Sequence, residues 1–205
     1  MATIAGLQPL KEGKLGISGE DVTANTLAER RKAGLRIIPF ERNQEGLSLT
    51  SSLSENWCAA ALVNKSLAAS LRPSKIRSDA DQSLKAWDVR FVDVAQPASS
   101  LSGGNAQKVI LAREIDDQAK LIIAAQPTRG LDIGATAGVW AALREARNRG
   151  AGILLVSSDL DELFDICDRV VVMVSGQNAG TFQPPYDLVA VGHALTAAKP
   201  AAVMI

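Results

Sequence analysis

The chain has 205 residues, of which 47% are apolar, and its 22 basic side chains balance its 22 acidic ones. This length suits one domain with a sizeable core, and the zero net charge gives no support to a nucleic-acid surface read by bulk electrostatics. Since the sequence has only two cysteines, Cys58 and Cys167, and one histidine, His193, and no CxxC pair occurs, we expect neither a structural zinc site nor a disulfide framework.

In the first half of the chain, the spacing of apolar residues changes near residue 46. Short apolar runs broken by glycine and proline come first, and the expected elements are a helix end at 2–7, a short strand at 14–17, a polar helix at 26–33 and a buried strand at 35–38. From residue 46 to residue 100 the apolar residues are spaced as in helices, and Pro73 and Pro97 interrupt this pattern. This spacing predicts a mostly helical subdomain.

After residue 102 the pattern alternates between helix and strand. The sequence predicts helices at 106–115, 135–149 and 159–167, and buried strands at 121–125, 153–156 and 170–174. Such alternation argues for an α/β fold with a mainly parallel sheet. None of the apolar runs approaches the roughly 18–20 residues needed to cross a bilayer, and we expect no signal peptide.

A glycine pair precedes the helix predicted after residue 105. Ser102 is a good N-cap, and Gly103 and Gly104 leave the backbone amides around them unhindered. A helix start of this kind is suited to bind an anion, because its N–H groups are free and the helix dipole is positive there. Taken alone, the same residues serve equally well as an ordinary helix cap.

The ordered set of motifs resembles the C-terminal half of an ATP-binding-cassette (ABC) domain. The string LSGGN at 101–105 is similar to the family's signature motif and PTRGLD at 127–132 to its D-loop region. Within the string ILLVSSDLDE at 153–162, Ser157 and Ser158 occupy the family's switch position. The string IPFER at 38–42 resembles the Q-loop region of the second cassette of simple-sugar and nucleoside import ATPases, usually I-P-E-D-R. Phe40 departs from that pattern.

Three segments are named from this resemblance. The signature segment is residues 101–105, the D-loop segment is residues 130–132 and the Q-loop segment is residues 39–42. The members of the Q-loop and D-loop segments are Pro39, Phe40, Glu41 and Arg42, and Gly130, Leu131 and Asp132. In the family, the Q-loop couples nucleotide state to the membrane partner and the D-loop shapes the interface between two cassettes.

The resemblance implies a P-loop NTPase-like (RecA-like) parallel sheet core. An ABC ATPase domain is expected at residues 1–185, with a helical subdomain at about 47–113 and a C-terminal tail at 186–205. The phosphate-binding string G-x-x-x-x-G-K-[ST] does not occur in the sequence. Residues 2–7 correspond to the end of the helix that follows this loop, so we expect an N-terminally truncated domain.

Three positions where the family carries catalytic side chains are degenerate. Ala125 and Gln126 stand where Asp and Glu are usual, and Ser158 stands where a histidine is usual. Ala125 offers no oxygen to magnesium and Gln126 cannot take a proton from water. We expect no catalytic residue and no metal ligand in this chain, and we expect Ser158 to cap the helix after it, because Ser158 and Asp161 form an S-x-x-D pattern.

The signature motif of the family completes the ATP site of a partner cassette. The residues expected to bind nucleotide in this way are Leu101, Ser102, Gly103, Gly104, Asn105 and Gln107. ATP and Mg²⁺ are therefore expected only in a composite site, and the expected partners are another cassette, in the same polypeptide or a separate one, and transmembrane permease subunits, not nucleic acid. The expected place is the cytoplasmic face of the cell membrane. Two alternatives are a non-enzymatic interaction module and a truncated product without independent activity.

Overall fold

The computed structural model describes residues 1–62 and 72–196, and contacts divide the chain into two units, Met1–Val156 and Ser157–Ile205. This boundary differs from the expected one between residues 185 and 186. The helices of the first unit are α1 (Ala2–Ala5), α2 (Leu27–Lys32), α3 (Leu53–Leu62), α4 (Pro73–Ala86), α5 (Gly103–Glu114) and α6 (Ile133–Asn148). Its strands are β1 (Gly16–Ile17), β2 (Glu20–Asp21), β3 (Leu35–Ile38), β4 (Leu121–Ala125) and β5 (Gly152–Val156). A π-helical turn, η1 (Arg42–Gly46), and a 3₁₀ turn, η2 (Ala98–Ser100), complete the first unit.

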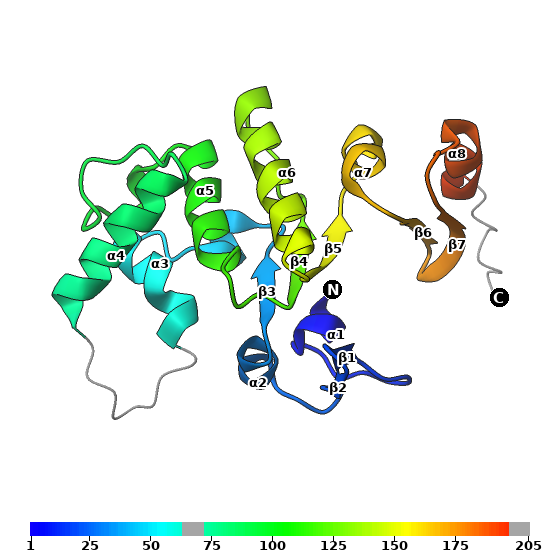
Figure 1. The fold of residues 1–205 in the computed structure, drawn as a ribbon, viewed down its shortest axis with the longest axis horizontal. Helices are drawn as coiled ribbons and strands as arrows, with labels where there is room; N and C mark the ends of the chain where they lie inside the picture. The colour runs from blue at the N-terminus through cyan, green and yellow to red at the C-terminus, as the bar shows by residue number, and fades with distance from the viewer. Residues whose placement is uncertain (63–71, 197–205) are drawn as a thin grey trace, which may run out of the picture. The chain divides into compact units, whose positions relative to one another are not determined.

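The centre of the first unit is a parallel sheet with the strand order β3-β4-β5 (Figure 1). All three strands lie where apolar runs predict strands, but only β3 and β4 are buried as expected, since the residues of β5 are exposed or half-buried. Ile122, Ile123 and Ala124 of the middle strand are fully buried, as expected for a parallel strand covered on both faces. Leu35 pairs with Leu121, and this register brings the carboxyl ends of β3 and β4 side by side. The loops that follow these two strands therefore meet at one edge of the sheet.

Helices α3, α4 and α5 pack together in the region where the sequence predicts helices (Figure 1). Helix α5 also contacts β3 and η1, so it joins this group of helices to the sheet. The helix begins at Gly103, three residues before the expected start at residue 106. The expectation was wrong because glycine has a low helix propensity, whereas Ser102 caps the helix and compensates for it.

The N-terminal elements pack against one face of the sheet. Helix α1 matches the helix end expected at residues 2–7, and Gly6 closes it in the left-handed conformation, with φ of 82°. The buried residues Ile17, Val22, Leu35 and Ile123 form a common core, which joins the hairpin of β1 and β2 to strands β3 and β4. Thr26 and Glu29 form the capping box of α2, which fits the predicted helix.

The second unit contains helix α7 (Leu160–Ile166), strands β6 (Val170–Val174) and β7 (Gln177–Phe182), and helix α8 (Leu188–Thr196). Strand β6 is at the predicted place, but it pairs antiparallel with β7 rather than in a parallel sheet. Ser175 and Gly176 have φ of 51° and 79°, as a tight hairpin turn requires. Val172, Val191 and Ala194 form the core of this unit. Residues 188–196, expected to belong to a tail, thus form a packed helix.

The cap of α7 corrects one prediction. Asp159, not Ser158, is the N-cap, and its Oδ1 accepts hydrogen bonds from the backbone N–H groups of Asp161 and Glu162 at 3.0 and 3.3 Å. The S-x-x-D pattern pointed to the residue one position too early, because the chain enters the helix at an aspartate that caps as well as a serine does.

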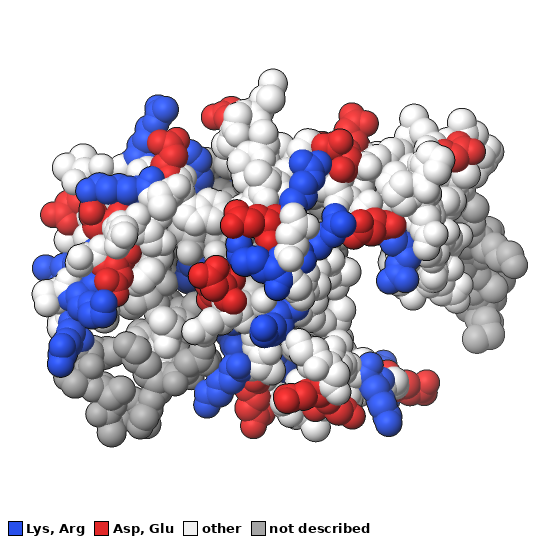
Figure 2. All heavy atoms as spheres, in the orientation of Figure 1, with Lys and Arg blue, Asp and Glu red and all other residues white. Residues whose placement is uncertain are grey.

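Charged side chains of both signs are distributed over the described part of the molecule. On the face drawn in Figure 2, lysine and arginine side chains are interspersed with aspartate and glutamate. Within residues 1–62 and 72–196, no helix combines the length and the apolar character that a membrane span requires.

Candidate functional site

The signature segment forms the N-terminal end of α5. The Ser102 hydroxyl accepts hydrogen bonds from the backbone N–H of Asn105 at 3.4 Å and from its side-chain Nδ2 at 3.0 Å. Ser102 and Gly103 are exposed, and Gly104 and Asn105 are half-buried. The first turn carries no acidic side chain. The end of a 12-residue helix is thus open to solvent, with its positive dipole end uncovered.

Asn105 also contacts the loop that follows α4. Its Oδ1 accepts a hydrogen bond of 2.9 Å from the backbone N–H of Arg90. The side chain of Asn105 therefore connects Ser102, on its own helix, with the loop that follows α4. This arrangement holds the start of α5 in place without using the backbone N–H groups of Gly103 and Gly104.

The Q-loop segment lies against the signature segment. Arg42 Nη1 donates a hydrogen bond of 3.1 Å to the carbonyl oxygen of Arg129. A Cβ atom added to Gly103 would lie 2.6 Å from Arg42 Nη2, and one added to Gly130 would lie 3.5 Å from the same atom. The guanidinium thus sits against two glycines, and it brings positive charge to the N-terminal end of α5. A side chain at position 103 would displace the guanidinium of Arg42 from this place.

A reciprocal contact joins the same two loops. Arg129 Nη1 lies 3.2 Å from Glu41 Oε1, and the guanidinium stacks over the Phe40 ring at 4.8 Å from its centroid. All three side chains are substantially exposed, so each contact contributes little stability alone. Phe40, where the resemblance would place a glutamate, thus packs on Arg129 and has no carboxylate for metal or water.

The D-loop segment connects β4 to α6 and touches the signature segment. A Cβ added to Gly104 would lie 3.7 Å from Leu131 Cδ2. Asp132 is the N-cap of α6, and its Oδ1 accepts from the backbone N–H of Ala135 at 2.8 Å. The sequence did not reveal this capping role, although an aspartate before a predicted helix is a recognised signal.

Gln107 is buried inside the first unit and does not belong to the exposed face. It is only 3% exposed, and its Nε2 donates a hydrogen bond of 2.9 Å to the carbonyl oxygen of Pro127. The expectation that Gln107 binds a partner's nucleotide is therefore corrected. It ties α5 to the turn before the D-loop segment. Helical spacing could have indicated this, because Gln107 lies at i to the apolar residues Ile110 and Leu111 at i+3 and i+4, and all three are buried.

A hollow of about 920 Å³, here named the signature cavity, opens between α5 and α6. Ser102, Gly104, Asn105, Leu131 and Asp132 are among the residues that line it. Lys108 and Asp88 lie on the same wall, 2.9 Å apart. The hydrogen bond from Lys108 is the main cause that lowers the pKa of the Asp88 carboxyl.

Two of the three degenerate positions lie where β4 ends, and the third lies in the second unit. Ala125 ends β4 and is 2% exposed, and Gln126 follows it with φ of 49°. Ser158 belongs to the second unit. In the described ranges, 1–62 and 72–196, no group of three or more His, Cys, Asp or Glu side chains is placed to hold a metal ion.

The chain is similar to ATP-binding proteins of ABC transporters. A family model described as ABC transporter matches residues 1–129. The chain is 35% identical over 183 residues to the nucleoside import ATP-binding protein NupA of Lactococcus lactis subsp. cremoris (strain MG1363), covering 88% of this chain and 36% of NupA. It is 34% identical over 174 residues to the ribose import ATP-binding protein RbsA of Chelativorans sp. (strain BNC1), covering 85% of this chain and 34% of RbsA.

A third relative is the guanosine import ATP-binding protein NupO of Bacillus subtilis (strain 168), which is 34% identical over 183 residues, covering 88% of this chain and 36% of NupO. The chain spans about a third of the length of these curated relatives. Among solved structures, the dimeric cassette MJ0796 in a post-hydrolysis state with ADP and Pi has a TM-score of 0.75 at 20% identity, covering 89% of this chain and 78% of that one. This likeness shows the cassette fold.

Proposed function

The chain belongs to the ABC transporter family, and we propose that it is an ATP-binding component of an importer for simple sugars or nucleosides, in which its signature segment completes the ATP site of a companion cassette. The sugar and nucleoside branch is suggested by relatives that import ribose, nucleosides and guanosine. The companion is either another part of the same polypeptide or a separate chain.

The observation that carries this proposal is the contrast between the start of α5 and the end of β4. The N-terminal end of α5 is exposed and capped, with Ser102 and Gly103 open to solvent. By contrast, β4 ends at Ala125, which offers no oxygen to a magnesium ion. Phosphoryl transfer needs a phosphate cradle, a metal and a group that orients water. Exposed helix-terminal donors, beside a strand end without an oxygen for a metal, fit the completing half of a shared ATP site.

In the composite site, ATP and Mg²⁺ would be held by the companion. Ser102 and the backbone N–H groups of Gly103 and Gly104 would donate to the γ-phosphate, where negative charge favours the positive end of α5. Arg42 would add positive charge near the same point and hold the D-loop segment beside it. Asp132, at the rim of the signature cavity, would face the companion. The protein would attach to the inner face of the membrane through permease subunits, which its Q-loop segment would contact.

An affinity label tests this assignment. In a Ser102→Cys variant combined with the companion cassette, an ATP analogue with a thiol-reactive group on its γ-phosphate should modify Cys at position 102. The parent chain, which keeps Cys58 and Cys167, is the control for labelling elsewhere. Modification that occurs equally without the companion, or none in the complex, would contradict the proposed composite site.

A further inference from the structure

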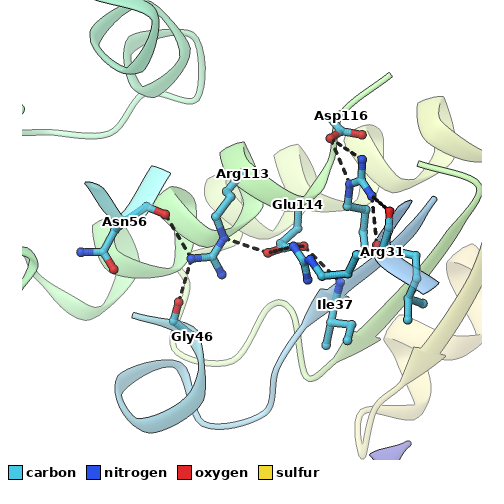
Figure 3. Close-up of polar contacts among 9 residues, drawn as sticks. Arg31, Ile37, Gly46, Asn56, Arg113, Glu114 and Asp116 are labelled. Atoms are coloured by element: carbon cyan, nitrogen blue, oxygen red, sulfur yellow. Dashed lines mark hydrogen bonds and ion pairs between the residues drawn. The ribbon is translucent and has the colours of Figure 1, made fainter. Parts of the chain in front are cut away.

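A buried cluster of charged side chains lies at the opposite end of α5 from the signature segment (Figure 3). Glu114 is 1% exposed and accepts two hydrogen bonds from Arg31 Nη2, at 3.0 and 2.9 Å. It also accepts one from Arg113 Nε at 2.8 Å and one from the backbone N–H of Ile37 at 3.2 Å. The carboxylate is fully paired, which a buried charge requires, and it anchors the end of α5 to β3.

Arg113 extends from this cluster towards the helical subdomain. Its Nη1 donates to the carbonyl oxygen of Gly46, at the end of η1, at 3.0 Å, and to that of Asn56, in α3, at 3.2 Å (Figure 3). Asn56 in turn accepts from the backbone N–H of Ser48 at 2.8 Å and donates to its carbonyl oxygen at 2.9 Å. One guanidinium therefore holds the turn after the Q-loop segment, the start of α3 and the end of α5 together.

The backbone of η1 also packs tightly on α5. A Cβ added to Gly46 would lie 2.5 Å from Ile110 Cδ1, so the turn approaches the helix more closely than any side chain at position 46 would permit. Because η1 begins at Arg42, a shift of this turn on α5 would move the residue that lies against Gly103. Arg42, at one end of η1, thus reaches the start of α5 through its side chain, and Gly46, at the other end, lies against Ile110 and accepts a hydrogen bond from Arg113.

This junction is accessible from outside. A hollow of about 590 Å³, here named the η1 cavity, is lined by Gly46, Ser48, Asn56, Ala59, Arg113 and Glu114 among others. Its wall consists of the groups that Arg113 connects, so a partner that fills it would press on η1 and α3 directly. Arg113 is the donor that the carbonyl groups of Gly46 and Asn56 share, so its removal would release both from the end of α5.

We propose that Arg113 is a positioning residue, which transmits displacement at the η1 cavity to the signature segment through α5. This inference rests on the proposed function, in which a permease subunit contacts the Q-loop side of the chain. Arg113 does not touch nucleotide. It acts by keeping η1 and α3 fixed to the helix whose other end offers Ser102 and Gly103 to the companion's ATP.

The test places a bulky group in the cavity and measures its effect at the far end of α5. In the full chain with Cys167→Ser, an Ala59→Cys variant is labelled with a large maleimide, and hydrogen exchange is measured for residues 102–110. A Ser78→Cys variant, labelled on the exposed surface of α4, is the matched control. We expect the label at 59 to change exchange at 102–110 by roughly threefold or more, and the label at 78 to leave it unchanged.

The response should disappear when Arg113 is replaced. Arg113→Ala removes both carbonyl contacts, and Arg113→Lys keeps the positive charge beside Glu114 but cannot reach all three acceptors at once. Hydrogen exchange of β4, residues 121–125, reports whether each variant is folded. If Arg113→Ala does not fold, the result for Arg113→Lys decides the test. A response that persists without the arginine, or no response in the parent, overturns the inference. Because no companion or ATP is present, this result is independent of whether the proposed composite site exists.

Discussion

Arg42 Nη1 donates a 3.1 Å hydrogen bond to the carbonyl oxygen of Arg129, a residue 87 positions farther along the chain. The bond connects the loop after β3 with the loop after β4, and the same guanidinium lies against Gly103 and Gly130. One side chain thus contacts the Q-loop, D-loop and signature segments. The parallel pairing of β3 and β4 brings these loops together, and Arg42 is one of the side chains that join them.

Replacing Arg42 by alanine should loosen the turn after β4. We expect faster amide exchange at residues 127–132 and a loss of about 1 kcal/mol in the free energy of unfolding, as for one hydrogen bond. Arg77→Ala, at an exposed position of α4, is the control. Unchanged exchange at residues 127–132 would show that the turn keeps its structure without Arg42.

Gln107 provides a test of the buried contact between α5 and Pro127. Gln107→Leu has a similar volume but leaves the Pro127 carbonyl without its donor, so we expect a loss of about 1–3 kcal/mol in the free energy of unfolding. Gln82→Leu, at an exposed position of α4, should change it far less. Urea unfolding curves measure both, and equal stability of the two variants would argue against a structural role for this amide.

The two roles of Asp132 can be separated by comparing substitutions. Asp132→Ala removes the cap of α6 and should cost about 1 kcal/mol in the free energy of unfolding, whereas Asp132→Asn retains a capping oxygen and should be nearly neutral. Because we propose that the carboxylate of Asp132 faces the companion, Asp132→Asn should still weaken the association of the two cassettes, as measured by binding of the purified companion cassette. Equal binding of Asp132→Asn and the parent would leave Asp132 with its capping role alone.

The Asp88 and Lys108 pair at the signature cavity predicts a pH dependence. The pKa of Asp88 is lowered below its ordinary value of 3.8, chiefly by the hydrogen bond from Lys108. The stabilisation from this pair is therefore complete above the pKa of the unfolded chain and is lost as the pH falls through the lower pKa of the folded state. Lys108→Met should raise the Asp88 pKa towards 3.8, which an NMR titration of the carboxyl measures. A pKa that does not move would contradict the assigned cause.

Much of the first unit could be predicted from the sequence, because its strands are short apolar runs. β3, β4 and β5 appear where residues 35–38, 121–125 and 153–156 predict them. The apolar runs of β3 and β4 fit strands that are buried on both faces, whereas the residues of β5 are exposed or half-buried in this structure. The start of α5 was predicted three residues late because the glycines of the signature segment disfavour helix. Their helical conformation depends on the cap at Ser102.

The contacts within the site could not be predicted in the same way. Arg42 and Arg129 meet because the strands before them are neighbours in the sheet, and the sequence of neither loop indicates which strands pair. Glu114 and Arg113 are charged residues at a helix end, a pattern typical of a solvated face, yet both side chains are largely buried. In the second unit, Asp159 rather than Ser158 caps α7, because two adjacent residues both suit the position and the sequence does not say where the helix begins.

ATP turnover by the companion cassette tests the central claim most directly. The companion, with an intact phosphate loop, is titrated with the parent chain, with Ser102→Arg and with Ser78→Arg as the matched control on α4. The account predicts that the parent and Ser78→Arg raise turnover to the same plateau, and that Ser102→Arg still binds the companion but lowers turnover by roughly 100-fold, as for the loss of a transition-state donor. Equal turnover with Ser102→Arg and the parent would show that the signature segment takes no part in the companion's ATP site.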